Sequence, residues 1–271
     1  MTESSHNLLA VRNLRKSYPI DSRALGPERA KAHRALALDS VTFSLDRGET
    51  LGIVGESGCG KTTLARLLLR LIEPDSGEIR LDGRDWLAAN GEQLRSLRRR
   101  IQMVFQDPAA SLNPRMNVRS IVGEPLAIHE PRLSRAERRA RIAAILKAVG
   151  LDREAATRHS HEFSGGQRQR IGIASALILH PDLLVADEPV SSLDVSAGAQ
   201  IIELLDRLRR ELSLTLILVS HNLPVVAQLA TWIAVMQSGR FVEMGPAEQV
   251  IRSPQHPYTH SLLAAVPQIP A

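Results

Sequence analysis

One eight-residue segment constrains this chain of 271 residues more than any other feature of its sequence. The segment Gly55-Glu-Ser-Gly-Cys-Gly-Lys-Thr62 fits the pattern G-x-x-x-x-G-K-[ST] and stands between an apolar run at 51–54 and a helical pattern at 63–72. Glycines let the backbone N–H groups of such a loop converge on an anion, and the following helix adds its positive dipole end. The lysine then reaches the phosphates, and the last hydroxyl binds Mg²⁺. The segment therefore predicts a nucleotide-binding phosphate loop.

Apolar runs and helical patterns alternate around this loop. Strands are expected at 8–12, 41–45, 50–54, 78–81, 101–105, 183–186 and 214–219, helices at 63–72 and 195–212, and a hairpin around Ser238-Gly239. The runs at 183–186 and 214–219 are continuously aliphatic, which is typical of parallel strands buried on both faces. The helix between them gives βαβ order. On the helix at 63–72, an apolar face is expected from Leu64, Leu67, Leu68 and Leu71.

The middle of the chain has a different pattern. No strand is expected between 107 and 163, and a helix is expected at 134–149, where Ser134 and Glu137 fit a capping box. Its apolar face is expected to comprise Ile142, Ile145, Leu146 and Val149, with Gly150 at the C-terminal end. We interpret 107–163 as a helical subdomain inserted into one nucleotide-binding domain of 1–271. The core of this domain comprises 1–106 and 164–250, and its tail comprises 251–271. The polar, basic stretch 19–37 is expected to be an exposed loop.

Composition excludes several classes of protein. Hydrophobic residues make up 44% of the chain, which excludes a wholly disordered protein, and 34 basic against 29 acidic residues give a modest charge of +5. Only 3% of residues are aromatic, which disfavours stacked-base platforms for nucleic acid. The sequence pI of about 10.0 leaves nucleic acid and anionic membrane surfaces open as partners. The single cysteine, Cys59, excludes an internal disulfide and a Cys-based zinc site. Without a signal-peptide pattern or an apolar run of about 18 residues, we expect a cytoplasmic protein.

A second functional segment is the apolar run Leu183-Leu-Val-Ala that ends in Asp187 and Glu188. A carboxylate at the carboxyl end of a strand beside a phosphate loop is suited to Mg²⁺. The next carboxylate can polarise a water molecule as a general base. A solvated strand-end turn is the alternative for this pair, since Pro189 follows.

Ser164-Gly-Gly-Gln167 precedes a helical pattern at 168–179 and permits a helix cap or a second anion site. Three more motifs lie along the chain: Gln106 after a predicted strand, Ser191-Ser-Leu-Asp194, and His221 after another predicted strand. With the phosphate loop and the acidic pair, this order resembles the ATP-binding cassette (ABC) ATPases over about 8–244. The resemblance implies an α/β fold: a P-loop NTPase (ABC ATPase) core with a β-rich edge and the inserted helical subdomain.

The resemblance also implies a role for each motif residue. The catalytic residues are Glu188 as general base, His221 at the γ-phosphate, Gln106 and Lys61. The ATP-binding residues are Tyr18, which stacks on adenine or is only a strand-end aromatic, and Gly55, Glu56, Ser57, Gly58, Cys59, Gly60, Lys61, Thr62 and Thr63. The residues that contact the ATP of a second subunit are Ser164, Gly165, Gly166, Gln167 and Asp194. The Mg²⁺ ligands are Thr62, Gln106 and Asp187.

Two segments, 104–115 and His256-Pro-Tyr-Thr259, are similar to the peptide and nickel importer group of this family. That similarity implies ATP and Mg²⁺ as cofactors and uptake of di- or oligopeptides. The implied partners are a second ATPase subunit in a heterodimer (or a homodimer in isolation), two transmembrane permeases and, indirectly, an extracytoplasmic binding protein. No nucleic-acid partner is implied. The implied location is peripheral, on the cytoplasmic side of the plasma membrane. Nickel, opine or glutathione importers and the ABC-like subunit of a carbon–phosphorus lyase complex remain alternatives.

Three features depart from the family pattern. Phe163 stands where leucine usually opens the signature motif, and Asn222 stands where aspartate usually follows the histidine. The chain stops soon after the His-Pro-Tyr-Thr segment, without the cysteines that carry an iron–sulfur cluster in many relatives, so no cluster is expected. The cargo binds to other chains, and these residues therefore do not encode its identity.

Overall fold

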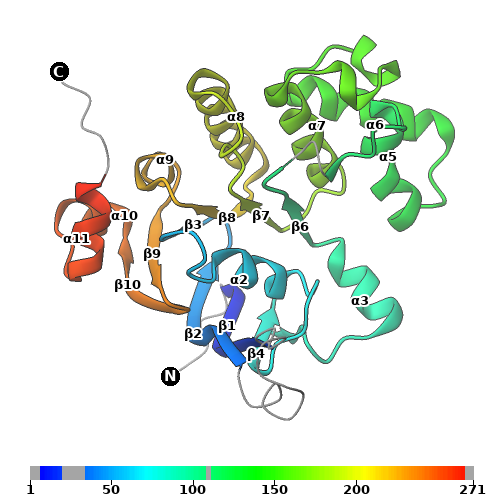
Figure 1. Ribbon diagram of the computed structural model, residues 1–271. Helices are drawn as coiled ribbons and strands as arrows, with labels where there is room; N and C mark the ends of the chain where they lie inside the picture. The colour runs from blue at the N-terminus through cyan, green and yellow to red at the C-terminus, as the bar shows by residue number, and fades with distance from the viewer. Residues whose placement is uncertain (1–6, 20–33, 108–110, 266–271) are drawn as a thin grey trace, which may run out of the picture. The chain divides into compact units, whose positions relative to one another are not determined.

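The computed structural model describes residues 7–19, 34–107 and 111–265 (Figure 1). They form two compact units. The first unit comprises the described parts of Met1–Asp46, Leu51–Ala89 and His221–Ala271, and the second comprises Arg47–Thr50 and Asn90–Ser220. Each unit has its own strands, helices and buried apolar residues, and each is described by itself below.

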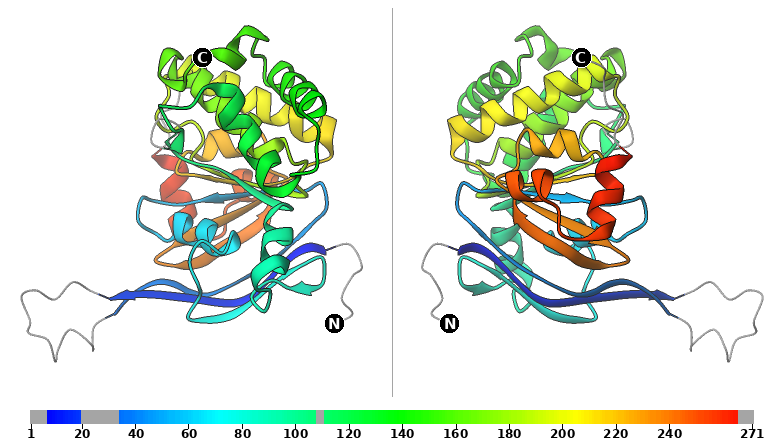
Figure 2. Two further views of the ribbon diagram at one scale, coloured as in Figure 1. Left: turned by 90° about the vertical axis from the view of Figure 1, so that its right-hand side faces the viewer. Right: turned by 90° about the vertical axis from the view of Figure 1, so that its left-hand side faces the viewer.

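The first unit contains an antiparallel sheet in the order β2-β1-β4-β5. Its strands are β1 (Asn7–Pro19), β2 (Arg34–Asp46), β4 (Ser76–Leu81) and β5 (Arg84–Asp85). β1 and β2 are paired from Asn7 with Asp46 to Pro19 with Arg34, and Figure 2 shows them side by side as a long ribbon. Buried positions alternate along β2 from Asp39 to Leu45, whereas β1 buries the adjacent Leu8 and Leu9 and pairs with β2 through several register shifts.

The phosphate loop lies in the same unit, between β3 (Thr50–Val54) and α2 (Lys61–Leu68). β9 (Trp232–Gln237) runs parallel to β3 and antiparallel to β10 (Arg240–Pro246). Three short helices complete the unit: α9 (Leu223–Ala227), α10 (Ala247–Arg252) and α11 (Pro257–Ala264). All five residues of β3 are buried, so the loop begins on a fully packed strand.

The second unit contains three parallel strands, with β7 (Leu183–Asp187) between β6 (Ile101–Val104) and β8 (Thr215–Ser220). The helices are α3 (Gly91–Arg98), α5 (Val118–His129), α6 (Arg135–Ala148), α7 (Gly165–Leu177) and α8 (Val195–Leu212), with short 3-10 turns η1 (Glu154–Thr157) and η2 (Ser160–Glu162). β7 and β8 are buried along their whole length, as their aliphatic sequences predict.

The helical character predicted for the middle of the chain is confirmed. Between 107 and 163, the described residues form only an isolated bridge, Asn117 with His159, and otherwise helices and turns. The capping box of α6 is present: Ser134 accepts from the Glu137 N–H, and the Glu137 carboxylate accepts from the Ser134 N–H. The predicted apolar face of α6 is buried at all four positions. The proposed borders of core, insert and tail remain a prediction.

Two sequence predictions are wrong in detail. The helix predicted at 63–72 ends as α2 at Leu68, because Arg70 adopts a left-handed φ of +52° and Leu71 turns away with 50% of its surface exposed. The loop prediction for 19–37 is wrong at its two ends, because Pro19 ends β1 and residues 34–37 lie in β2. Residues 20–33 lie outside the described residues. None of the described helices combines the length and hydropathy that a membrane span requires.

The end of α2 provides a matched test of packing. We expect Leu68→Ala to lower the free energy of unfolding by about 3 kcal/mol, because Leu68 is fully buried and its truncation leaves a cavity. Leu71→Ala makes the same chemical change at a half-exposed position and is expected to cost less than about 1 kcal/mol. Urea unfolding followed by circular dichroism measures both. Equal losses in the two variants would contradict the helix end described here.

Candidate functional site

The phosphate loop holds its lysine inside the loop. The Lys61 side chain is 4% exposed, and its ammonium donates to the carbonyl oxygens of Gly55 at 2.7 Å and Glu56 at 2.8 Å. An ammonium group has three donors and no acceptor, so these carbonyls fix the position of a cation. A positive charge therefore lies where the sequence predicts phosphate.

Two glycines of the loop are required by close packing. A Cβ atom on Gly60 would lie 2.5 Å from a backbone oxygen of β2, and Gly60 has a φ of +115°, a conformation that favours glycine. A Cβ atom on Gly55 would lie 2.2 Å from a backbone oxygen of β9. The Cys59 side chain is buried under the loop, and burial raises the pKa of its thiol, which keeps it neutral. The loop is thus held tightly against its own unit.

The start of α2 suits an anion. Among the described residues, no side chain caps this helix at Gly60, and its first turn carries no acidic residue. The first N–H groups of a helix have no intrahelical acceptor, and the helix dipole gives them partial positive charge. Together with Lys61, these groups fit the phosphates of a nucleotide.

The two predicted carboxylates lie at the end of β7. Asp187 is 2% exposed, and Glu188 is half-buried with a left-handed φ of +46°. Such a conformation costs of the order of 1–3 kcal/mol for a residue with a Cβ atom and is found most often at functional sites. The Glu188 N–H donates to the Val219 carbonyl at 2.9 Å, which helps to hold this conformation.

Gln106 and Glu188 lie in contact although 82 residues separate them in the sequence. The Gln106 amide nitrogen donates to a Glu188 carboxylate oxygen at 3.2 Å. The structure therefore brings together the glutamine and the general base that the motif order predicts. This hydrogen bond uses the amide nitrogen of Gln106 and not its amide oxygen.

Ser164 caps α7. Its hydroxyl accepts from the Gln167 N–H at 3.4 Å, and the Gln167 side chain accepts from the Ser164 N–H at 3.0 Å. Of the two interpretations open from the sequence, the helix cap is present. Phe163 is 4% exposed, and the Arg158 guanidinium lies 4.3 Å from its ring centroid, so the unusual first residue of the motif has a packing role.

Two other motif residues also cap helices. The Asp194 carboxylate accepts from the Ala197 N–H at 2.9 Å at the start of α8, and the adjacent Val195 side chain is 92% exposed. The Asn222 side chain accepts from the Val225 N–H at 3.2 Å at the start of α9. Aspartate caps helices equally well, so Asn222 keeps the local structure that follows His221. His221 itself is exposed.

Tyr18 lies next to the end of β1, where it pairs with Ala35 of β2. Its side chain is 37% exposed, and the Lys16 ammonium lies 5.6 Å from the ring centroid. Both interpretations of this residue from the sequence, a strand-end aromatic and a platform for adenine, are compatible with this position.

The predicted residues are divided between the two units. The phosphate loop, Tyr18 and His221 belong to the first unit, whereas Gln106, Asp187, Glu188, the 164–167 motif and Asp194 belong to the second. Sequence reasoning missed one contact within the first unit: the hydroxyl of Tyr258, in the His-Pro-Tyr-Thr segment, accepts from the N–H of Glu56 at 3.0 Å. The His-Pro-Tyr-Thr segment stands out in the sequence, but nothing in its pattern predicts a contact with the phosphate loop.

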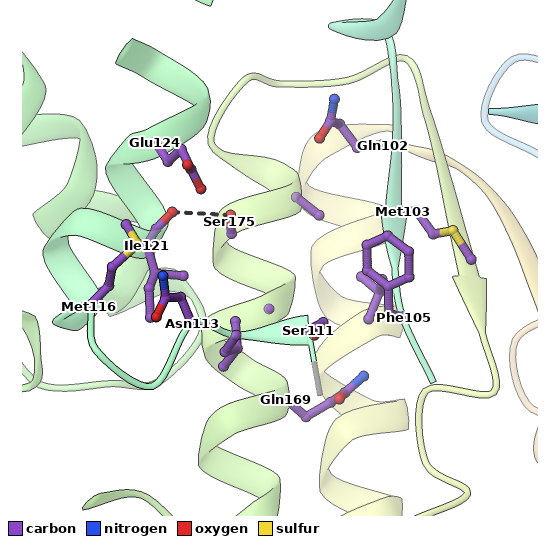
Figure 3. Close-up of a pocket in the computed structure, with 14 residues that line it drawn as sticks. Gln102, Met103, Phe105, Ser111, Asn113, Met116, Ile121, Glu124, Gln169 and Ser175 are labelled. Carbon is purple, nitrogen blue, oxygen red and sulfur yellow. Dashed lines mark hydrogen bonds between the residues drawn. The ribbon is translucent and has the colours of Figure 1, made fainter. Parts of the chain in front are cut away.

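A cavity of about 280 Å³ lies in the second unit, between β6, α5 and α7 (Figure 3). Its wall includes Phe105, which is 47% exposed, and Gln169, which is 1% exposed. Among the described residues, the side-chain nitrogen of Gln169 has no hydrogen-bond partner despite its burial. The cavity thus combines apolar surface with one buried amide side chain in its wall.

Comparison of the sequence with known protein families supports the resemblance to ABC ATPases. Residues 38–191 match the family model described as ABC transporter. The chain belongs to this family. It is an ATP-binding and ATP-hydrolysing subunit with the α/β fold of P-loop NTPases, as the resemblance implies. Residues 242–271 match a second model, described as the C-terminal region of oligopeptide/dipeptide transporters.

Two relatives illustrate the similarity. The chain is 48% identical over 265 residues to the oligopeptide transport ATP-binding protein AppF of Bacillus subtilis, covering 97% of this chain and 79% of AppF. It is 48% identical over 262 residues to the dipeptide transport ATP-binding protein DppF of Haemophilus influenzae, covering 97% and 79%.

Solved structures show the same fold. An ATP-binding cassette in a dimeric post-hydrolysis state bound to ADP and Pi is 29% identical, with a TM-score of 0.77 and coverage of 88% of this chain and 98% of that chain. CbiO1 of Clostridium perfringens, part of an ABC transporter complex, is 27% identical, with a TM-score of 0.77 and coverage of 92% of each chain.

Proposed function

We propose that this ATPase powers the uptake of di- or oligopeptides through partner permeases. The observation that carries the proposal is the match of 242–271 to the C-terminal region of oligopeptide/dipeptide transporters. Relatives that are 48% identical over nearly the whole chain are named for oligopeptide and dipeptide transport. In this role the protein is peripheral to the cytoplasmic face of the membrane, and an extracytoplasmic protein selects the cargo.

In the proposed mechanism, ATP is bound by the phosphate loop and hydrolysed at its γ-phosphate. Lys61 and the first N–H groups of α2 bind the phosphates, and Tyr18 stacks on adenine. Glu188 accepts a proton from the attacking water, and His221 contacts the γ-phosphate. The hydrogen bond from Gln106 to Glu188 supports this assignment, because it fixes one oxygen of the general base.

Mg²⁺ is the proposed metal of the site. Thr62, Gln106 and Asp187 offer a hydroxyl, an amide oxygen and a carboxylate, the hard oxygen ligands that Mg²⁺ prefers. The donor set therefore fits the ion. When bound, Mg²⁺ neutralises negative charge on the β- and γ-phosphates.

We further propose that two ATPase subunits act together, with the 164–167 motif of one completing the site of the other. A related cassette is dimeric with ADP and Pi bound. A second, different ATPase chain is the proposed partner in the transporter, and a homodimer forms when this chain is isolated.

The cavity between β6, α5 and α7 is the proposed contact with the permeases. It is formed partly by the segment that precedes Gln106, so a cytoplasmic helix seated in it can be coupled to Glu188 through Gln106.

Gly172→Leu tests this contact, because Gly172 lines the cavity and a Cβ atom there would meet no described atom within 4 Å apart from its chain neighbours and the backbone of its own helix. The larger side chain is expected to fill the cavity without lowering the melting temperature, since leucine is also favoured over glycine in helices by about 1 kcal/mol. Capture of permeases from membranes is expected to fall at least about tenfold, which corresponds to 1.4 kcal/mol of binding. Ala144→Leu, at an exposed position of α6, is the matched control. Full capture by Gly172→Leu would contradict the assignment.

The function is tested with a tagged Glu188→Gln variant in gently solubilised native membranes containing ATP and Mg²⁺. Mass spectrometry of the captured chains is expected to find two multispanning permeases and a second ATPase. The attached binding protein is then screened for peptides. A soluble enzyme assembly without permeases would contradict the transport function and favour a carbon–phosphorus lyase type of complex.

A further inference from the structure

The segment that follows β10 is anchored by one carboxylate. Glu243 of β10 accepts hydrogen bonds from the N–H groups of Gln255 at 2.8 Å and His256 at 3.0 Å, and from the Thr259 hydroxyl at 2.5 Å. Burial by itself raises the pKa of Glu243, but these hydrogen bonds outweigh it and hold the pKa below its usual value, so the carboxylate stays charged. Thr259 is fully buried. The start of α11 is therefore fixed to the sheet.

The same anchor orients Tyr258. The N–H of Tyr258 donates to Nδ1 of His256, which caps α11, and Pro257 is the first residue of the helix. With the residues on both sides fixed, the Tyr258 side chain reaches the phosphate loop, and its hydroxyl accepts from the N–H of Glu56 at 3.0 Å. Burial raises the pKa of Tyr258, so the phenol remains neutral at physiological pH.

The peptide groups of Glu56 connect the tail to the catalytic lysine. Its N–H is bound by Tyr258, and its carbonyl oxygen accepts from the Lys61 ammonium at 2.8 Å. Glu56 is the second residue of the loop, and its side chain is exposed, so its backbone is not held by side-chain packing. A continuous set of hydrogen bonds thus runs from Glu243 through α11 to the loop that holds Lys61.

We propose that Tyr258 is a positioning residue for the phosphate loop, which the tail braces in the conformation that receives the phosphates of ATP. This inference rests on the proposed function of the loop in ATP binding. It gives each residue of the His-Pro-Tyr-Thr segment a defined role. The histidine caps α11, the proline is the first residue of that helix, the threonine binds Glu243, and the tyrosine binds the N–H of Glu56. Because Tyr258 acts through the loop backbone, its loss affects nucleotide affinity more than the chemical step.

Tyr258→Phe is the direct test, because it removes only the hydroxyl oxygen. We expect KM for ATP and Kd for ADP with Mg²⁺ to rise about 3- to 10-fold, the loss of one hydrogen bond, while kcat changes less than about twofold. The melting temperature is expected to stay constant. Hydrogen exchange of the Glu56 amide, resolved by NMR, is expected to become faster, which a merely structural role of Tyr258 elsewhere would not produce.

Two further variants complete the test. Thr259→Val removes the hydroxyl bound to Glu243 and is expected to raise KM in the same direction. Ser261→Ala removes a hydroxyl from the exposed side of the same helix and is expected to change nothing. If the wild-type chain hydrolyses ATP but Tyr258→Phe changes neither KM for ATP nor the hydrogen exchange of the Glu56 amide, the inference is overturned. Failure of the proposed transport function is a separate result, since the chain would then be captured without permeases but would still bind and hydrolyse ATP.

Discussion

Replacing Glu188 with glutamine is expected to lower the rate of ATP hydrolysis by about 10²- to 10⁴-fold, the range for loss of a general base. Glutamine keeps the size of the side chain and can still accept from the Gln106 amide, so the local structure is expected to persist. ATP affinity is expected to stay within about threefold of wild type, because the proposed phosphate contacts come from Lys61 and the start of α2. Steady-state release of phosphate and equilibrium binding of ATP measure the two effects separately.

The same variant is expected to accumulate as an ATP-bound dimer. If ATP binds between two subunits and hydrolysis releases them, a chain that binds without hydrolysing stays associated. Sedimentation velocity with ATP and Mg²⁺ is expected to show dimers for Glu188→Gln and mostly monomers for wild type after turnover. Glu203→Gln, at an exposed position of α8, is the matched control and is expected to behave as wild type. Separate, non-associating Glu188→Gln chains with ATP bound would contradict the shared site.

Two elements were predictable from the sequence to their last residue. β3 and α8 have the bounds that their patterns predict, because β3 is apolar throughout and α8 has Asp194 as a cap and a leucine-rich face. Ends that depend on distant contacts were not predictable. The outer part of β1 is polar, and its strand structure comes from pairing with β2, as at Tyr18 with Ala35.

The end of α2 was missed for a similar reason. Sequence reasoning expects a helix to end at glycine, but the residue in the left-handed conformation here is Arg70. Its guanidinium binds Glu73 and the carbonyl oxygens of Trp86 and Ala89. These contacts lie 3 to 19 residues away, and the local pattern carries no signal of them.

The candidate site was predictable to the extent that its chemistry is encoded in short motifs. The phosphate loop requires glycines at fixed spacing, and a strand that ends in two carboxylates is a local pattern. The roles of Gln106 and Glu188 were inferred from a family resemblance, but the hydrogen bond between them was not predicted. The contact of Tyr258 with Glu56 joins residues 202 apart, and a tyrosine that binds a backbone N–H has no local pattern that would indicate it.

A mixing experiment tests the shared site most directly. Lys61→Ala removes the buried ammonium and is expected to abolish ATP hydrolysis, because charged hydrogen bonds of about 1.5–3 kcal/mol each are lost. Gly166→Arg places a large cation at the start of α7 and is expected to abolish hydrolysis while ATP binding to the loop persists. Neither variant alone is expected to turn over.

Mixed together, the two inactive variants are expected to regain part of the wild-type rate. In a head-to-tail dimer, the Gly166→Arg chain supplies an intact phosphate loop, and the Lys61→Ala chain supplies an intact 164–167 motif, so one of the two sites is complete. The regained rate is expected to depend on the proportion of the two chains and to peak near equal amounts, which phosphate release measures across a titration. Mixing either variant with Glu188→Gln tests the position of the general base. If Glu188 acts on the ATP held by its own phosphate loop, the pair of Lys61→Ala with Glu188→Gln has no complete site and stays inactive. Under the same condition, and only then, the pair of Gly166→Arg with Glu188→Gln regains activity. Activity in the first of these pairs would show that Glu188 acts across the dimer instead.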